Sequence, residues 1–320
     1  MPAAFLTAVV QAMRLEAEDI ISIELRPAPG ESFPAFDAGS NIDLHLPNGM
    51  VRSYSLLNSQ DETDRYVIGV LKDRASRGGS RCVHEALRLG QRLTISAPSN
   101  NFALHEDADH SVLLAGGIGI TPLLSMARRL KAMGRSIELI YAARARPAAA
   151  FVDELKALGV PVQWHFDADA GGPPDLRALL TARVPGSNTH YYACGPSVML
   201  DAFEKVCADL GYANAHIERF TSVELKPADD ALQTYVVELR RSGKLLTVGP
   251  GQSLLGTLKA GDVDVATSCE EGICGTCEVK VLEGEPDHRD SILSASERAA
   301  NRSMMVCVSG CKSERLVLDL

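Results

Sequence analysis

Four cysteines near the C-terminal end constrain the fold of this 320-residue chain more than any other feature. They follow the pattern Cys269-x4-Cys274-x2-Cys277, and a fourth, Cys307, lies on a separate segment. This is the ligand spacing of one class of [2Fe–2S] cluster, in which a tight loop supplies three thiolates and a distant segment supplies the fourth. Such a cluster carries one electron at a time, so two-electron chemistry elsewhere in the chain must be divided before it arrives here.

Zinc and disulfide sites are the alternatives for these cysteines. Zinc sites usually pair two short cysteine hooks, and only Cys311 lies near enough to Cys307 to complete a second one. The spacing therefore favours the cluster and leaves Cys311 as a spare thiol. Cys82 and Cys207 fall in expected helices, where we interpret them as small core residues.

Length and charge narrow the class of protein. A chain of this size suits two or three domains of about 100 residues each. The net charge of −9 argues against nucleic acid as a partner, because phosphate binding requires a basic surface. No uncharged apolar run approaches the roughly 20 residues of a membrane span, and no basic residue precedes an apolar N-terminal segment. We expect a cytoplasmic protein that does not bind membranes.

Residues 1–106 show short runs of alternating apolar and polar residues, punctuated by glycine and proline. This pattern predicts an antiparallel β-barrel with one helix near 80–89. Residues 107–222 instead alternate strands and helices, which predicts a doubly wound, mostly parallel sheet. The expected strands there are 112–115, 137–141, 162–166, 190–193 and a segment near 216–220, and the expected helices are 123–133, 149–158, 175–182 and 198–210.

Residues 223–232 are polar, contain one proline and are interpreted as a linker. Beyond it, residues 233–320 predict a small α+β domain around the cysteine loop. Its expected elements are a hairpin of 235–240 and 245–248, a helix at 253–260, and strands at 278–282 and 304–308.

Two segments of the barrel region point to a bound phosphate and a flat ring. The strand end Arg52-Ser53-Tyr54-Ser55 offers a cation, an aromatic face and hydroxyl groups. The segment Arg77-Gly78-Gly79-Ser80 opens the expected helix, whose N–H groups can bind phosphate. The strand motif alone is short, and an ordinary strand with a surface arginine and a half-buried tyrosine is the alternative.

Two turns in the second region point to a dinucleotide. Gly116-Gly117-Ile118-Gly119 follows a strand and leads into Thr121-Pro122, so a pyrophosphate can approach the backbone at a helix start. Pro122 replaces the third glycine of the usual fingerprint and suits a first helical turn. Cys194-Gly195-Pro196 follows the fourth expected strand, at the edge where such sheets bind ligands.

These motifs resemble known families. The cysteine segment resembles plant-type ferredoxins over roughly the last 90 residues, and the strand and turn motifs resemble the ferredoxin–NADP reductase superfamily. The order of the three parts, over the whole chain, resembles phthalate dioxygenase reductase and its relatives, including vanillate demethylase reductases. The resemblance implies a flavin barrel, a doubly wound nicotinamide domain and a β-grasp [2Fe–2S] domain.

The resemblance also implies an activity. FMN would lie on the Arg52–Ser55 strand with its phosphate at the Arg77–Ser80 helix start, and the Cys194-Gly195-Pro196 turn would lie beside the nicotinamide of NADH. Phe220 would pack near the flavin, although a core phenylalanine is nearly as good an interpretation. NADH would reduce FMN, and single electrons would pass through the cluster to a Rieske-type terminal oxygenase. No side chain is assigned acid–base catalysis.

Several alternatives stay open at this point. The absence of a clear adenine-stacking aromatic after the barrel helix agrees with FMN over FAD. Asp167 can bind a ribose hydroxyl, which favours NADH, whereas Arg144 and Arg146 would suit the 2′-phosphate of NADPH. A stand-alone NAD(P)H flavin or ferric reductase would not need the cysteines. A cluster-only electron carrier would not need the two binding motifs, and a structural zinc protein is the remaining alternative.

Overall fold

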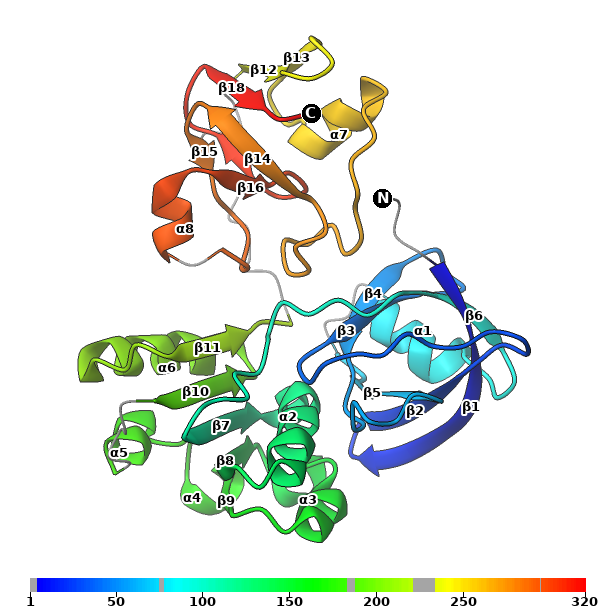
Figure 1. The fold of residues 1–320 in the computed structure, drawn as a ribbon, viewed down its shortest axis with the longest axis vertical. Helices are drawn as coiled ribbons and strands as arrows, with labels where there is room; N and C mark the ends of the chain where they lie inside the picture. The colour runs from blue at the N-terminus through cyan, green and yellow to red at the C-terminus, as the bar shows by residue number, and fades with distance from the viewer. Residues whose placement is uncertain (1–4, 75–77, 183–187, 221–233, 294) are drawn as a thin grey trace. The chain divides into compact units, whose positions relative to one another are not determined.

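The computed structural model describes residues 5–74, 78–182, 188–220, 234–293 and 295–320 (Figure 1). The described residues form two compact units, one ending at Phe220 and the other comprising 234–320. The predicted linker at 223–232 lies outside the described residues, and so does Arg77. In the described part of the chain, no helix is long and apolar enough to cross a membrane.

The first unit begins with the predicted antiparallel barrel. Its six strands pair in the order β4-β3-β6-β1-β2-β5. A bridge between Leu56 and Ile68 closes the ring, and the N–H of Leu57 donates to the carbonyl of Val67 at 2.9 Å. Helix α1 (Gly79–Ala86) contributes Cys82 and Val83 to the barrel core. The strands are β1 (Phe5–Ala17), β2 (Ile20–Pro27), β3 (Asn41–His45), β4 (Val51–Ser55), β5 (Tyr66–Leu71) and β6 (Arg92–Ser96).

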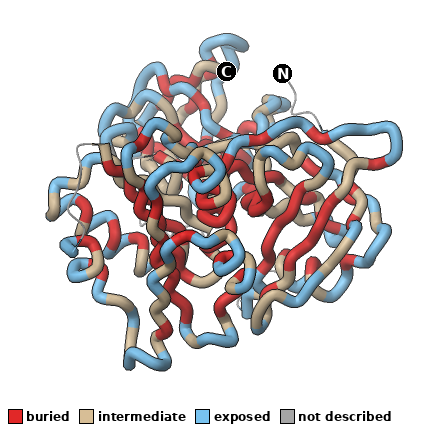
Figure 2. Tube along the Cα trace, turned by 60° about the horizontal axis from the view of Figure 1, so that its bottom comes forward, coloured by how far each residue is buried: buried red, intermediate tan, exposed pale blue. Residues whose placement is uncertain are grey.

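The same unit contains the predicted doubly wound sheet, with five parallel strands in the order β11-β10-β7-β8-β9. Alternate residues of the central strands β7, β8 and β10 enter two cores, one shared with α2 and α3 and the other with α5 and α6 (Figure 1). Figure 2 shows buried stretches in the interior of the chain trace and exposed residues at its outer bends. The elements are β7 (His110–Gly116), η1 (Gly117–Gly119), α2 (Ile120–Ala132), β8 (Ser136–Ala143), η2 (Arg146–Ala148), α3 (Val152–Leu158), β9 (Val162–Phe166), α4 (Asp167–Ala170), α5 (Leu176–Thr181), β10 (Thr189–Cys194), α6 (Ser197–Leu210) and β11 (Ala215–Glu218).

The barrel and the parallel sheet pack against each other through β5 and α2. Barrel residues Leu57 and Val67 belong to the same apolar core as the buried face of α2. The hydroxyl of Ser125 on α2 donates to the carbonyl of Asn58 at 3.1 Å. A Cβ atom at Gly69 would lie 2.7 Å from Thr121 Cγ2, so glycine permits this close approach. The predicted boundary at residue 106 falls in the connection between β6 and β7.

The second unit is the predicted α+β domain, built on a sheet in the order β13-β12-β18-β14-β16. The central strand β18 runs parallel to β12 and antiparallel to β14, and the sequence analysis missed it together with α8. The strand expected at 304–308 is shorter, because the chain leaves the sheet before Cys307. The elements are β12 (Tyr235–Leu239), β13 (Leu245–Val248), α7 (Leu254–Ala260), β14 (Glu278–Glu283), β15 (Pro286–Asp287), α8 (Ala295–Ala300), β16 (Ser303–Met305), β17 (Gly310–Cys311) and β18 (Arg315–Leu318).

The contact between the barrel and α2 gives a first prediction. Gly69→Val should lower the free energy of unfolding of the first unit by about 1–3 kcal/mol, because the added side chain must displace Thr121 and Phe151. Urea denaturation measures this change. Gly249→Ala is the control, because its Cβ meets only the flexible Gln252 side chain. Equal stability of Gly69→Val and wild type would contradict the close packing described here.

Candidate functional site

Two glycine-containing turns meet where the strand order of the parallel sheet reverses, between β7 and β10. A Cβ atom at Gly119 would lie only 2.1 Å from the carbonyl oxygen of Cys194. Similarly, a Cβ atom at Gly195 would lie 2.9 Å from Gly116 Cα, and one at Gly116 would lie 2.7 Å from Pro196 Cδ. The two predicted turns therefore touch backbone to backbone, at the strand-end crevice where open α/β sheets bind ligands.

The first turn leads into α2 through the short helix η1. Gly117 has a positive φ of 55°, which favours glycine at this position. The hydroxyl of Thr121 donates to the carbonyl of Ile118 at 3.1 Å, and both Thr121 and Pro122 are buried. These two residues hold the turn in shape at the start of α2, the kind of helix N-terminus that binds anions.

The strand motif and the helix start of the barrel also lie together. A Cβ atom at Gly79 would lie 2.7 Å from Arg52 Nε, so the arginine side chain crosses the start of α1. Gly78 precedes the helix with a φ of 116°, a conformation that favours glycine. Ser80 Oγ accepts a hydrogen bond from the N–H of Asp73 at 3.2 Å. The arginine and the helix N-terminus thus concentrate positive potential at one place.

Ser53 and Tyr54 of the strand motif have separate environments. Ser53 donates to the carboxylate of Asp43 on the neighbouring strand. Tyr54 packs against the barrel core, and burial raises the pKa of its hydroxyl. Tyr54 is therefore neutral at ordinary pH and offers an aromatic surface next to Arg52.

Glu218 connects the barrel motif to the second glycine turn. Ser55 Oγ, at the end of β4, donates to Glu218 Oε2 at 3.2 Å. Glu218 is paired in register with Cys194 across β10 and β11. Burial raises the pKa of Glu218 to about 8, against the opposing effect of the Ser55 hydrogen bond. Burial, helped by the Glu218 carboxylate, also raises the pKa of the Cys194 thiol well above its usual range.

Glu218 is a site residue that the sequence analysis did not select. The sequence feature that could have identified it is a carboxylate at the end of the last strand, directly before Arg219 and Phe220. Phe220 is partly buried and packs against the core beneath the sheet.

A pocket lies at the ends of β8 and β9, as expected for a nucleotide-binding sheet. Arg146 Nε is 3.0 Å from Asp169 Oδ2, and the guanidinium lies 4.7 Å from the centre of the Phe166 ring. Asp167 Oδ1 lies 3.3 Å from His165 Nε2. The lining residues are Arg146, Trp164, His165, Phe166, Asp169 and Ala170.

The second unit brings the four predicted cluster cysteines together. Cys277 Sγ lies 3.0 Å from Cys307 Sγ, across the gap between the loop and the distant segment. The backbone N–H of Glu271 donates to Cys269 Sγ at 3.3 Å. Gly272 must be glycine, because its φ is 71° and a Cβ atom would lie 2.6 Å from Val308 Cγ2.

The protonation of these thiols fits a cationic metal cluster. The hydrogen bond from Cys269 lowers the pKa of Cys274 to about 5, and the corresponding bond raises the pKa of Cys269. In the same way, the contact with Cys307 lowers the pKa of Cys277. An iron–sulfur cluster of this class requires four thiolates with N–H donors around them, and this unit supplies both the four cysteines and the backbone N–H of Glu271. The thiol of Cys311 donates elsewhere, to the carbonyl of Ser313 at 3.0 Å.

The raised pKa of Glu218 predicts a pH-dependent stability. Between about pH 4.5 and 8 the Glu218 carboxyl loses its proton in the unfolded chain but keeps it in the folded chain. The free energy of unfolding therefore falls as pH rises, by at most about 1.4 kcal/mol per pH unit. Glu218→Gln removes this loss, and the variant should gain stability relative to wild type between pH 5 and 8. Urea denaturation across this range tests the prediction. The exposed Glu18→Gln is the control, and a pH-independent difference for Glu218→Gln would contradict it.

Comparison with known families supports the assignment of the cysteine-containing unit and of the parallel-sheet domain. Residues 237–312 match the 2Fe-2S iron-sulfur cluster binding domain, and residues 113–205 match the oxidoreductase NAD-binding domain. The predicted cluster domain and nicotinamide domain are therefore confirmed.

Related proteins align over nearly the whole chain. Tetrachlorobenzoquinone reductase of Sphingobium chlorophenolicum is 50% identical, with 95% of this chain and 94% of that protein covered. Phenoxybenzoate dioxygenase subunit beta of Ectopseudomonas oleovorans is 46% identical, with coverage of 97% and 96%. The solved structure of phthalate dioxygenase reductase, described as modular for electron transfer from pyridine nucleotides to [2Fe–2S], is 37% identical, with coverage of 99% and 98% and a TM-score of 0.73. The chain belongs to the phthalate dioxygenase reductase family.

Proposed function

We propose that this protein is the reductase component of a multicomponent oxygenase, taking electrons from NADH and delivering them singly through a [2Fe–2S] cluster. The observation that supports the proposal most directly is the position of Glu218 between the two binding motifs. Ser55, at the end of the barrel motif, donates a hydrogen bond to Glu218. Glu218 in turn pairs with Cys194, the first residue of the second glycine turn. The cysteine loop of the same chain would hold the cluster that passes single electrons to the acceptor. When bound, a flavin accepts a hydride and releases its electrons one at a time, and the cluster carries them onward.

FMN is the flavin we propose for the barrel. Arg52 and the N-terminus of α1 form a compact cationic end that suits a terminal phosphate. Arg77, Gly78, Gly79 and Ser80 are the proposed phosphate contacts, with Arg77 adding charge. Tyr54 and Ser55 would hold the ring, since one presents an aromatic face and the other a hydroxyl group.

NADH is the proposed electron donor, bound across the two glycine turns. The pyrophosphate would lie at Gly117–Gly119, and the nicotinamide would lie beside Cys194-Gly195-Pro196. The pocket at β9 favours NADH over NADPH, because the charge of Arg146 is already paired with Asp169. Asp167 lies at the start of α4 and is the proposed ribose contact; its carboxylate would repel a 2′-phosphate.

The residues between the two binding surfaces position the reactants and move no proton. Ser55 and Glu218 fix the end of β11 against the end of β4. Cys194 is fully buried, and its raised pKa keeps the thiol protonated. Its side chain would therefore line the site without carrying a charge. We propose that Phe220 covers the flavin until the nicotinamide arrives. Hydride transfer depends on this alignment more than on acid–base catalysis.

The proposed cluster ligands are Cys269, Cys274, Cys277 and Cys307. The N–H groups of the loop would donate to the cluster and stabilise its reduced, more negative state. Cys311 has no place in this set, because its thiol already donates to Ser313.

The proposed partner is a terminal oxygenase. The 46% identical relative is named as a dioxygenase subunit, which supports an acceptor of this class. We propose a Rieske-type centre in that partner and a cytoplasmic location for the complex. The net charge of −9 would favour a basic docking surface on the acceptor.

A second candidate is quinone reduction, favoured by the name of the 50% identical relative, tetrachlorobenzoquinone reductase. A small quinone could take both electrons directly at the flavin and would not need the cluster. The two functions are therefore distinguished by their dependence on the cysteines.

The cluster dependence is testable with Cys274→Ser. In this variant NADH should still bleach the flavin band in an anaerobic spectrum, whereas electron delivery to cytochrome c as a one-electron acceptor should fall by about 100-fold or more, because the cluster is not assembled. Cys311→Ser, in the same unit, is the matched control and should behave as wild type. Unchanged delivery by Cys274→Ser would overturn the relay, and retained quinone reduction by that variant would support the second candidate.

The contact between the turns gives another prediction. Gly119→Ala should lower kcat/KM for NADH by about 100-fold, because its Cβ forces the Cys194 turn away and a displacement of about 1 Å is enough for such a loss. Stopped-flow flavin reduction measures this change. Flavin content and cluster absorbance should match wild type, and an unchanged kcat/KM would contradict the assignment of the turns.

A further inference from the structure

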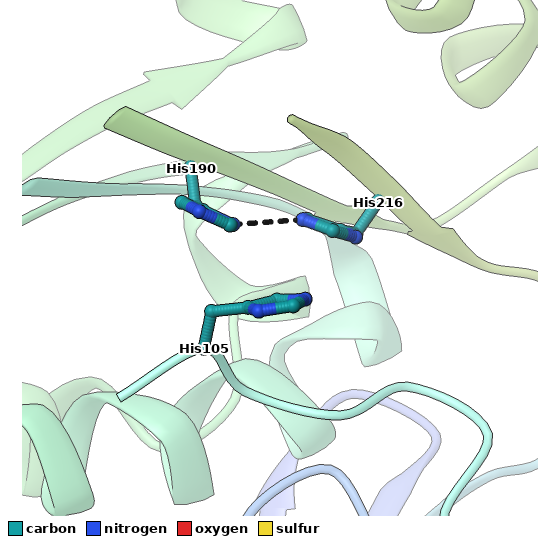
Figure 3. A group of neighbouring side chains, drawn as sticks. All are labelled: His105, His190 and His216. Atoms are coloured by element: carbon teal, nitrogen blue, oxygen red, sulfur yellow. Dashed lines mark hydrogen bonds between the residues drawn. The ribbon is translucent and has the colours of Figure 1, made fainter. Parts of the chain in front are cut away.

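Three histidines from distant parts of the chain meet on one face of the parallel sheet (Figure 3). His190 lies near the start of β10, His216 lies on the neighbouring strand β11, and His105 lies in the connection between β6 and β7. One ring nitrogen of each lies within 4.8 Å of the others. Two strands and a connection thus bring their imidazoles together, with His190 near the start of the strand that ends at Cys194.

The spacing of the ring nitrogens approaches that of a metal site. His190 Nδ1 and His216 Nε2 are 3.0 Å apart (Figure 3). The His105 ring lies with its centre 4.4 Å from that of His190 and 4.9 Å from that of His216. Nitrogen ligands at about 2.1 Å in a tetrahedral zinc site lie about 3.4 Å from one another. The nitrogens are thus near the required spacing, but the His105 ring is tilted by only 33° from His190 and 28° from His216, so it must turn about its side-chain bonds before its nitrogen points at a shared ion.

The surroundings orient these rings and keep them available as ligands. The backbone N–H of His105 donates to the hydroxyl of Tyr192 at 2.9 Å, and the Tyr192 ring stacks on His216 at 4.7 Å. Burial and the neighbouring imidazoles lower the pKa of His216 to about 4, so this ring is neutral at physiological pH. His190 is buried whereas His105 is exposed, so an ion has a path from solvent to the inner nitrogens.

We propose that His105, His190 and His216 bind one divalent transition-metal ion, with zinc as the natural occupant. Three imidazoles suit zinc, and water from the open side near His105 would complete four-coordination. The ion would fasten the connection that leaves the barrel, residues 97–109, to two strands of the nicotinamide sheet. The site is independent of the flavin, the nucleotide and the cluster cysteines.

The alternative is an aromatic cluster that holds together without a metal. The hydrogen bond between His190 and His216 satisfies one nitrogen of each ring by itself. The stacking with Tyr192 would contribute packing energy in either case. The two interpretations differ in one measurable respect, which is stoichiometric zinc binding that depends on His105.

The experiment uses holoprotein that retains flavin and cluster and has been freed of loosely bound metal with a chelator. Zn²⁺ is titrated against a chromophoric chelator, and the cluster absorbance is followed to show that it stays intact. We expect one zinc per chain. His105→Ala and His216→Gln should each weaken binding at least about tenfold, since even outer-shell partners are worth about 10–100-fold in affinity. His110→Ala, on the adjacent strand β7, is the matched control and should bind as wild type.

X-ray absorption at the zinc edge identifies the ligands directly. Imidazole scattering with nitrogen at about 2.0–2.1 Å is expected, whereas sulfur at about 2.3 Å would mean that a thiol binds the zinc and would overturn the proposal. Absence of a stoichiometric site, or binding by His105→Ala equal to wild type, would also overturn it. Because His105 is exposed in a connection, its replacement should leave the fold intact, and circular dichroism checks this.

Discussion

The approach of Gly119 to the carbonyl of Cys194 is the contact on which the arrangement of the candidate site depends. No side chain separates the turn after β7 from the turn after β10, so the ends of these strands lie as close as two backbones can. The strand order reverses at this point, beside the start of α2, and open α/β sheets bind ligands at such a reversal. A dinucleotide bound there would contact both turns at once, because the two turns lie against each other.

The second requirement is that the barrel meets the sheet at the same place, and two different interactions provide this. The apolar contact of β5 with α2 shares one core between the barrel and the sheet, and so contributes most of the stability of their joint. The hydrogen bond from Ser55 to Glu218 is weaker but directional, and it joins the ends of β4 and β11. Packing thus holds the two folds together, while a single buried carboxyl sets the alignment of their binding edges.

Local features of the sequence predicted most of the fold, whereas features that depend on distant residues were missed. The helices of the nicotinamide sheet and the strands of the barrel follow from periodicity within each segment. Strand β18 is only four residues long, and its parallel partner β12 lies far away in sequence, so no short pattern reveals that it is central. The expected strand at 304–308 was too long, because the requirement to release Cys307 toward the loop is a tertiary constraint.

The candidate site shows the same division. Each binding motif is a contiguous run of residues, so its chemistry could be inferred from the sequence. In the structure, Arg52 of the strand motif lies against Gly79 of the helix start. Glu218 and Ser55 are 163 residues apart, and neither residue alone carries a signal of their contact. The three histidines could be predicted from the sequence even less, because no single one of them lies in a recognisable motif. Only the pairing of β10 with β11 and the path of the connection bring them together.

The division of the chain into two units follows from the different demands of the two electron transfers. Hydride transfer needs its reacting atoms about 3–3.5 Å apart and aligned, and a shared core between barrel and sheet is what can supply such precision. Transfer of a single electron makes no comparable demand on orientation, so the cluster domain can be a compact unit with its own core. Within that unit the precision is again local, because Gly272 and the N–H groups of the loop hold four sulfurs in place. The chain therefore places its most rigid contacts, between barrel and sheet, where nuclei must be aligned.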